Sequence, residues 1–252
     1  MFPAYARMME RRNGPEPAST PGDFVDRLAA VETGPGCANF FDHTVPANAL
    51  RRRNLATYLG EMRDRGPKVL LVGEAPGFRG MRITGVPFTS RTILEGPVNA
   101  FGLFGPGKGY VLPPDAAGIA AEPTATVMWE VLAELDFLPL LWSACPWHTH
   151  LPGRPQSNRT PTAAEADLGT PFWQALAGEF AIETVVAVGN VAHRSLQRSG
   201  LDVPKIRHPA HGGRSGFKRG LEELIAAGVA GAAATRGAGR SPIFPGPPRA
   251  PR

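Results

Sequence analysis

The chain has 252 residues, of which 42% are hydrophobic, and carries a net charge of +5. This length accommodates one large domain or two small ones, and the apolar content is sufficient for a sizeable core. No apolar run is long enough to span a bilayer, and the arginine-rich start of the chain lacks the apolar segment of a signal peptide, so we expect a cytoplasmic protein. The two cysteines are too few for a disulfide framework or an all-cysteine metal cluster.

The excess positive charge is concentrated at the C-terminal end. Four arginines and no acidic residue lie between Ala226 and Arg252. The rest of the chain is close to neutral, so bulk charge does not by itself indicate a nucleic-acid partner. Pro, Gly and small residues also dominate both ends, and we expect residues 1–22 and 226–252 to lack fixed structure. A single domain is predicted for residues 23–225.

Apolar residues recur at helical spacing over residues 23–31 and 48–65, which predicts two helices. A run of aliphatic residues at 69–72 follows and predicts a buried strand. This strand leads into a loop rich in Gly and Pro that holds one acidic residue, Glu74. Because ligands of open α/β sheets bind outside the carboxyl ends of the strands, Glu74 is a candidate functional residue.

Strand and helix patterns then alternate along the chain. Residues 90–114 are predicted to be irregular, and a helix capped by Thr124 or Thr126 follows. A second strand is expected within residues 137–145, and Thr162 with Glu165 forms a capping box that predicts a helix over 163–179. A strand at 184–188, a helix around 191–196, a short strand ending at 206–207 and a helix around 217–224 complete the domain. This order predicts an α/β fold with three α/β/α layers and a central, mostly parallel four-stranded sheet.

Two common nucleotide-binding motifs are absent from the loop after the first strand. It lacks the Lys-Ser/Thr ending of a P-loop, and its glycines do not follow the G-x-G-x-x-G spacing. A nucleotide-binding domain or a small-molecule hydrolase on the same framework is therefore disfavoured.

Several motifs resemble those of the uracil-DNA glycosylase superfamily over residues 48–225. They are GEAPG at 73–77, TGVPF at 84–88, SNRTPTAAE at 157–165, VVAVGNVA at 185–192 and HPAHGG at 208–213. Their order is similar to that in the thermostable branch that carries an iron–sulfur cluster. The resemblance implies an enzyme that flips a damaged base, uracil above all, out of DNA and hydrolyses its N-glycosidic bond.

The resemblance also implies roles for individual residues. Glu74 would orient the attacking water and stabilise positive charge on the sugar, and His208 would donate a hydrogen bond to the departing base. Phe88 would stack on the flipped base, and backbone N–H groups of the first motif would add donors. The implied base-binding residues are Gly73, Ala75, Pro76, Gly77, Phe88 and Ser143.

Two acid-free basic clusters flank the motifs, between Glu74 and Glu95 and between Asp202 and Glu222. Such clusters suit a rim that follows DNA phosphates, although either cluster alone is more typical of a solvated face. The loop 210–216 is the candidate wedge into the base stack, with His211 or Arg214 at its tip. The implied DNA contacts are Arg82, Thr89, Ser90, Arg207, His211, Arg214 and Lys218.

The sequence departs from the family pattern at two places. Cys145 stands where one cluster ligand falls, but four cysteines are needed, so we expect no iron–sulfur cluster and no other cofactor. A zinc site at Cys145, His148 and His150 lacks a convincing fourth ligand.

The second departure is at the end of the second strand. Family members commonly present an asparagine there to pair with the base edge, and this chain has Ser143. A serine hydroxyl rotates freely, so it recognises the hydrogen-bonding edge of the base less strictly than an amide does. The pocket is therefore expected to accept other deaminated bases such as hypoxanthine, or to belong to a weakly active or non-catalytic DNA-binding relative. We expect a monomer.

Overall fold

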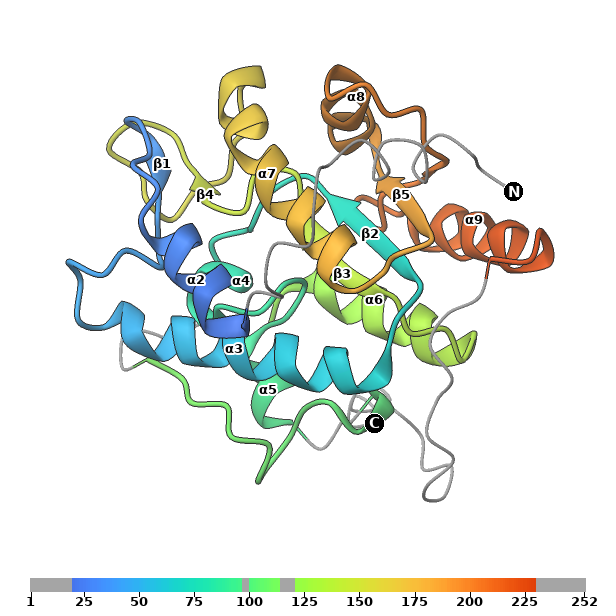
Figure 1. The fold of residues 1–252 in the computed structure, drawn as a ribbon, viewed down its shortest axis with the longest axis horizontal. Helices are drawn as coiled ribbons and strands as arrows, with labels where there is room; N and C mark the ends of the chain where they lie inside the picture. Colours follow the sequence, from blue (N-terminus) through green and yellow to red (C-terminus); the bar gives the residue numbers. More distant parts are fainter. Residues whose placement is uncertain (1–19, 97–99, 114–120, 230–252) are drawn as a thin grey trace, which may run out of the picture.

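The computed structural model describes residues 20–96, 100–113 and 121–229. Its centre is a four-stranded sheet in the order β3–β2–β5–β6 (Figure 1), in which every neighbouring pair is parallel. This arrangement confirms the predicted α/β class and the number of strands. The strands are β2 (Val69–Gly73), β3 (Leu140–Ser143), β5 (Thr184–Val188) and β6 (Lys205–Ile206).

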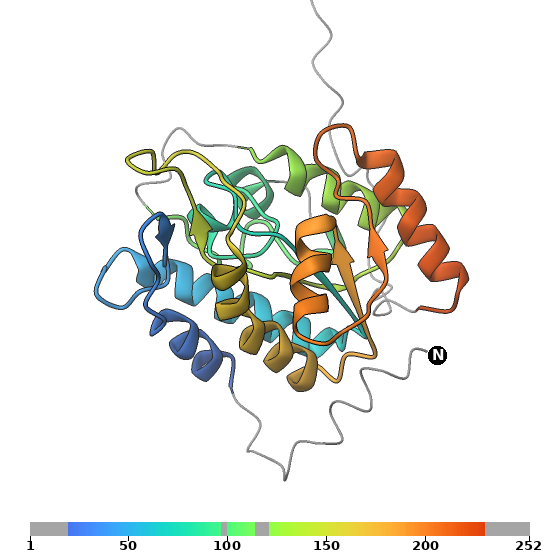
Figure 2. The ribbon, with the colours of Figure 1, turned by 90° about the horizontal axis from the view of Figure 1, so that it is seen from above.

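Helices cover both faces of the sheet (Figures 1 and 2). Right-handed crossovers between parallel strands place α6, which connects β2 to β3, on the face opposite α7 and α8. Helix α9 packs beside α6 and β6, so it belongs to the α6 layer. The principal helices are α2 (Pro21–Ala29), α3 (Asn48–Arg65), α6 (Pro123–Glu134), α7 (Ala163–Glu179), α8 (Asn190–Arg198) and α9 (Arg214–Ala226).

The long helix α3 protects the β3 edge of the sheet. An edge strand presents unpaired backbone groups, which must find partners when they are buried. The backbone N–H of Leu141 donates a hydrogen bond to the hydroxyl of Tyr58 on α3 at 3.2 Å. Both residues are fully buried, so the helix closes this edge with apolar packing and one hydrogen bond.

The helices predicted at 48–65 and 163–179 and the strand at 184–188 have the predicted bounds. The cap of α6 is corrected: the carboxylate of Glu122, not a threonine, accepts from the N–H groups of Thr124 and Ala125. The second strand is shorter than predicted. The expectations of disorder for 1–22 and 226–252 fall largely on 1–19 and 230–252, outside the described residues.

Several short elements were not predicted. The stretch expected to be irregular contains α5 (Arg91–Glu95) and a 3-10 turn, η1 (Ala100–Gly102). A short helix, α4 (Met81–Thr84), lies within the loop after β2. An antiparallel ribbon joins β1 (Cys37–Ala38) to β4 (His148–Thr149). No helix in the described ranges has both the length and the apolar character needed to cross a bilayer.

The strand order creates a crevice at one end of the sheet. The connections after β2 and β5 leave toward opposite faces, although these strands are neighbours. In open α/β sheets such a switch point is where ligands bind, at the carboxyl ends of the strands. Glu74 follows β2 directly and Gly189 follows β5 directly.

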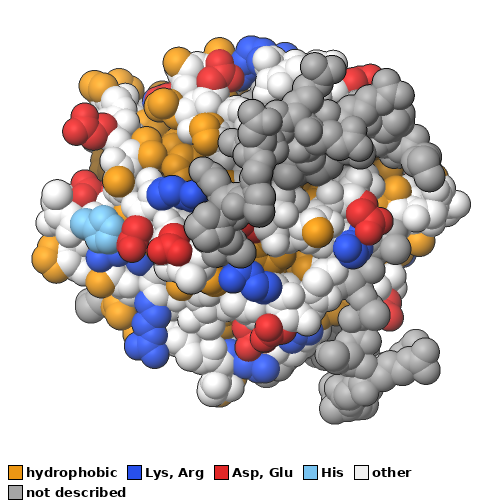
Figure 3. Space-filling model, viewed as in Figure 1, with side chains coloured by type: hydrophobic (Ala, Val, Ile, Leu, Met, Phe, Trp, Pro, Cys, Tyr) orange, Lys and Arg blue, Asp and Glu red, His pale blue; other side chains and the backbone are white. Residues whose placement is uncertain are grey.

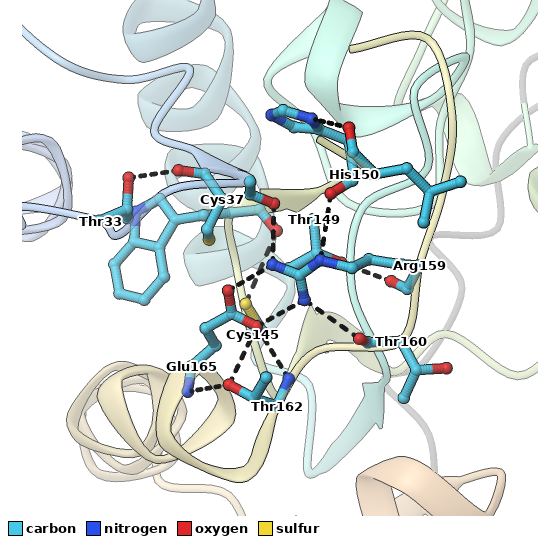
Figure 4. Close-up of polar contacts among 12 residues, drawn as sticks. Thr33, Cys37, Cys145, Thr149, His150, Arg159, Thr160, Thr162 and Glu165 are labelled. Atoms are coloured by element: carbon cyan, nitrogen blue, oxygen red, sulfur yellow. Dashed lines mark hydrogen bonds and ion pairs between the residues drawn. The ribbon is translucent and has the colours of Figure 1, made fainter. Parts of the chain in front are cut away.

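A two-point ion pair fixes the loop that leads from β4 to α7 (Figure 4). The guanidinium of Arg159 donates to both carboxylate oxygens of Glu165, at 2.7 and 2.6 Å. It also donates to the backbone oxygens of His150 and Gly36, at 3.1 and 2.9 Å. Glu165 in turn accepts from the backbone N–H of Thr162, as predicted for the capping box. One arginine thus ties this loop to α7 and to the β1–β4 ribbon.

Replacing Glu165 with glutamine is expected to lower the free energy of unfolding. The Arg159 guanidinium lowers the pKa of Glu165 from its ordinary value of 4.5 to about 2. The carboxylate therefore contributes stability above pH 4.5, and this contribution is lost as the pH falls toward 2. Because one pKa unit corresponds to about 1.4 kcal/mol, we expect Glu165→Gln to cost on the order of 3 kcal/mol at pH 7, measured by urea unfolding.

The difference between wild type and Glu165→Gln should shrink when the unfolding is repeated at pH 3. Asp167→Asn is the control, since Asp167 pairs with Arg198 on the surface, where the side chains are 51% and 38% exposed. Exposed pairs contribute less than about 1 kcal/mol. Equal losses in the two variants would contradict the assigned strength of the Arg159–Glu165 pair.

Candidate functional site

A cavity of about 370 Å³ lies at the carboxyl end of the sheet. Its wall includes five residues that the motifs predicted and that lie far apart in the sequence: Glu74, Phe88, Ser143, His208 and His211. The backbone of the first motif contributes Ala75, Pro76 and Gly77. The wall also includes residues that were not predicted, among them Glu122, Asn158, Arg159 and Thr160.

Glu74 presents a carboxylate to this cavity from a fixed backbone. Its backbone oxygen accepts a hydrogen bond from the N–H of Cys145 at 3.0 Å. Its side chain is half-buried and has no hydrogen bond or ion pair with the described residues. An unpaired carboxylate in a cavity is free to accept a hydrogen bond from a water molecule or a ligand.

Phe88 is held against the start of the first motif. A Cβ atom on Gly73 would collide with the Phe88 ring, so only glycine allows this contact. The backbone of Phe88 has a positive φ of 49°, which is a strained conformation for a large side chain. The indole N–H of Trp129 donates to the backbone oxygen of Phe88 at 2.8 Å. The ring is therefore locked as part of the cavity wall, although Gly73 itself does not line it.

His208 is kept neutral, in one tautomer. Burial lowers its pKa, and electrostatic interactions with Arg207 and His211 lower it further, to about 4. The backbone N–H of Ala210 donates to its Nδ1 at 3.2 Å. Nδ1 is therefore an acceptor, and the proton of the neutral ring lies on Nε2. The packing of His208 against Gly189, which has a φ of 91°, places this ring beside the end of β5.

Ser143 and Asn158 provide further polar groups in the cavity wall. Ser143 ends β3 and is 4% exposed. Asn158 precedes the anchored Arg159, and its side-chain oxygen accepts from the backbone N–H of Phe78 at 2.9 Å. The sequence contained a signal for Asn158, since it lies within the SNRTPTAAE motif, but nothing local indicated that it would face the cavity.

Thr89 and Ser90 do not have the predicted role in phosphate binding. Both residues are fully buried. The Thr89 hydroxyl donates to the backbone oxygen of Val86 at 2.7 Å. The Ser90 hydroxyl accepts from the N–H of Ile93 and caps α5. These hydroxyls stabilise the backbone around Phe88. Thr89 lies at the cavity wall, but neither hydroxyl is exposed at the surface in this structure, as contact with a DNA phosphate would require.

The basic cluster between Asp202 and Glu222 contains no acid in the sequence, but acidic side chains of another helix lie beside it in the structure. Arg214 forms ion pairs with Glu130 and Glu134 of α6, and Lys218 forms one with Glu134. Their charges are therefore largely compensated, which weakens the argument for phosphate contacts at both positions. The face shown in Figure 3 likewise has acidic and basic side chains interspersed over its described part.

The other predicted DNA contacts stay predictions. Arg207 and His211 are exposed, and His211 lines the cavity. Arg82 is half-buried, and its guanidinium lies 3.5 Å from the backbone oxygen of Phe78. Residues 214–216 of the predicted wedge loop form the first turn of α9, so only the turn at residues 210–213 remains available as a wedge.

No metal site is found in the described parts of the chain, where no three His, Cys, Asp or Glu side chains converge suitably. Cys37 and Cys145 lie together (Figure 4), and their interaction together with burial raises the pKa of Cys145, which keeps it a thiol. The ring nitrogens of His148 lie 2.9 and 3.1 Å from the backbone oxygens of Pro76 and Pro155. These contacts identify His148 as a structural residue.

Comparison with known proteins agrees with this arrangement. The family described as the uracil DNA glycosylase superfamily matches residues 59–236. No curated protein matches the chain significantly. Among the solved structures that match is that of wild-type SMUG2 from Pedobacter heparinus. The match covers 82% of this chain and 96% of the SMUG2 chain, with a TM-score of 0.53 and 13% sequence identity. At that identity the likeness concerns the fold alone. The family match spans more than half of the chain, and the chain belongs to the uracil DNA glycosylase superfamily.

Proposed function

We propose that this protein is a monofunctional DNA glycosylase that flips a deaminated base, uracil in the first place, out of DNA and hydrolyses its N-glycosidic bond. The observation that carries the proposal is the meeting of three groups in one cavity: the unpaired carboxylate of Glu74, the fixed ring of Phe88 and the neutral imidazole of His208. Membership of the superfamily supports an activity of this type. A cytoplasmic location and a monomeric state remain predictions.

The chemistry of base excision suits these groups. Positive charge develops on the sugar and negative charge on the departing base as the N-glycosidic bond breaks. Glu74 would accept a proton from the water that attacks the sugar carbon and stabilise the positive charge. The electron pair of the broken bond would go to the base, whose carbonyl would accept a hydrogen bond from Nε2–H of His208. A neutral donor serves here without forming a competing ion pair with Glu74.

The cavity also suits an extruded base. Flipping removes the base from its stack and requires a new aromatic or apolar surface for its face. Phe88 offers such a surface at the cavity wall, and its strained, locked backbone keeps the ring in place before DNA arrives. No cofactor enters the proposed reaction, since water is the only other reactant.

Ser143 favours a second candidate function. A hydroxyl at the end of β3 reads the base edge less strictly than an amide. A protein with this change would recognise a damaged site in DNA without efficient excision. Retained DNA binding with no abasic product from uracil or hypoxanthine substrates would support this candidate over the glycosylase.

Removing either proposed catalytic group is expected to slow excision. Glu74→Gln and His208→Ala should each reduce the single-turnover rate on uracil-containing DNA by about 100-fold or more, as for other acid–base and electrostatic groups. The rate is measured by alkaline cleavage of the abasic product. Glu95→Gln and His193→Ala, outside the cavity, are matched controls. A Glu74→Gln or His208→Ala protein as fast as its control would refute the assigned role.

The protonation state of His208 gives an independent prediction. With a pKa of about 4, the ring should remain neutral at pH 6, with its proton on Nε2. Nitrogen-15 NMR of labelled histidine would detect this tautomer. Stability should fall as the pH drops from about 6.5 toward 4, because the unfolded chain binds a proton there that the folded chain does not.

Arg207→Ala should raise the pKa of His208, since the positive charge of Arg207 contributes to its low value. The NMR titration of the variant should therefore have a higher midpoint than that of the wild type. A wild-type midpoint near the ordinary histidine value would contradict the burial of His208 and its proposed role as a neutral donor.

Ser143, at the end of β3, is expected to determine how strictly the pocket selects uracil over other deaminated bases. Ser143→Asn should raise the ratio of uracil to hypoxanthine excision by roughly tenfold, because an amide offers a donor and an acceptor to the imide edge of uracil. Competition assays with both substrates measure this ratio. Ser143→Ala is the control for loss of the hydroxyl, and an unchanged profile in Ser143→Asn would refute the assignment.

A further inference from the structure

Asn158 is an exposed residue at the cavity wall, and one hydrogen bond orients its amide. The backbone N–H of Phe78 donates to its Oδ1 at 2.9 Å. Since an N–H group requires an acceptor, this bond determines which end of the amide is oxygen. The amino group, Nδ2, then lies over Gly77, 3.7 Å from the position of a Cβ atom on that residue. Within the described residues it has no hydrogen-bond acceptor.

The loop that carries Asn158 is rigid at the next residue. The backbone N–H of Arg159 donates to the oxygen of Thr149 at 3.1 Å, and the Thr149 hydroxyl donates to the oxygen of Arg159 at 2.6 Å. The Arg159 side chain is held by Glu165 at two points. A polar group supported in this way is pre-organised, so a ligand that meets it loses little free energy in ordering the loop.

We propose that Nδ2 of Asn158 donates a hydrogen bond to the exocyclic carbonyl oxygen of the flipped base, and that this bond distinguishes a deaminated base from its parent. The proposal rests on the proposed function in one respect, namely that a flipped base enters this cavity. It assigns a specificity-determining role to a residue outside the strand ends.

Deamination changes the group that Asn158 would meet. It converts the exocyclic amino group of cytosine or adenine, a donor, into the carbonyl oxygen of uracil or hypoxanthine, an acceptor. An amide normally turns over to suit either group, but the bond to Phe78 turns the oxygen of Asn158 toward that N–H. With this bond kept, the amide presents its amino group to the base, which favours the carbonyl and opposes the amino group.

The side chains already assigned to the reaction or to the end of β3 are less suited to this distinction. The Ser143 hydroxyl rotates and serves as donor or acceptor, so it tolerates either form of the base. The carboxylate of Glu74 is an acceptor and would favour the parent amino group if it met the same edge. His208 is a second one-way donor, but the mechanism proposed for uracil uses it at the carbonyl beside the broken bond. The amide of Asn158, oriented with its amino group away from Phe78, is the side chain that we assign to the exocyclic position.

Two substitutions separate this role from a structural one. Asn158→Asp keeps the shape and the acceptor for Phe78 but replaces the donor by an oxygen. Asn158→Ala removes both. Gln156→Glu is the matched control, because Gln156 is an exposed residue of the same loop and gains the same negative charge away from the cavity. Circular dichroism would check that each full-length variant is folded.

The measurement is the affinity for duplexes that differ in one base. Each contains uracil or cytosine opposite an abasic analogue, so that base pairing does not contribute to the difference. A 2′-fluoro sugar at that position resists hydrolysis, because fluorine destabilises the sugar cation. Wild type and Gln156→Glu should bind the uracil duplex roughly tenfold more tightly than the cytosine duplex, and Asn158→Ala and Asn158→Asp should reduce this ratio to near one. Hypoxanthine and adenine should give the same pattern.

Three results would overturn the proposal: a wild type that binds both bases equally, an unchanged ratio in both Asn158 variants, or a ratio lost in Asn158→Ala but kept in Asn158→Asp. The last result would show that Asn158 only supports the loop of Phe78. Excision of ordinary uracil is measured separately. A protein that prefers uracil in binding but yields no abasic product would refute the glycosylase and leave the role of Asn158 supported.

Discussion

The hydrogen-bond ladder between β2 and β3 continues beyond the ends of both strands, and the site depends on this extension. The N–H of Ala144 donates to the oxygen of Gly73 at 2.8 Å, and that of Cys145 donates to the oxygen of Glu74 at 3.0 Å. The first residues of the loop are therefore held as firmly as the sheet. A carboxylate carried by a sheet-like backbone needs little reorganisation to meet a reacting group, and the Phe88 ring packs on the same Gly73.

The charges around the cavity are arranged so that the carboxylate of Glu74 stays unpaired. Arg159 lines the cavity, but Glu165 binds both sides of its guanidinium. His208 also lines the cavity, but burial keeps its ring neutral. Neither side chain therefore offers Glu74 an uncompensated positive charge. The ion pair that anchors the β4–α7 loop therefore also protects the chemistry proposed for the neighbouring acid.

The features predicted correctly from sequence were those with local causes. The buried run at 69–72 and the capping box of Thr162 and Glu165 are each determined by interactions or patterns within a few residues of the chain. The missed features depend on distant partners. The Phe78 N–H that orients Asn158 lies 80 residues away, as does the Glu134 that pairs with Arg214. Two-residue strands such as β1 and β4 have no periodicity, and no pattern predicts them.

The position of the amide in the cavity bears on the breadth of substrates. The family asparagine at the end of the second strand offers a donor and an acceptor together and so checks the imide of uracil as a unit. In this chain Ser143 takes that position, and the amide of Asn158 lies on another wall with its oxygen turned toward Phe78. With the role proposed for Asn158, such a pocket would verify one carbonyl and would leave the rest of the base edge loosely read. Uracil and hypoxanthine share that carbonyl but differ in ring size. The structural logic therefore favours recognition of deamination itself over recognition of a single base.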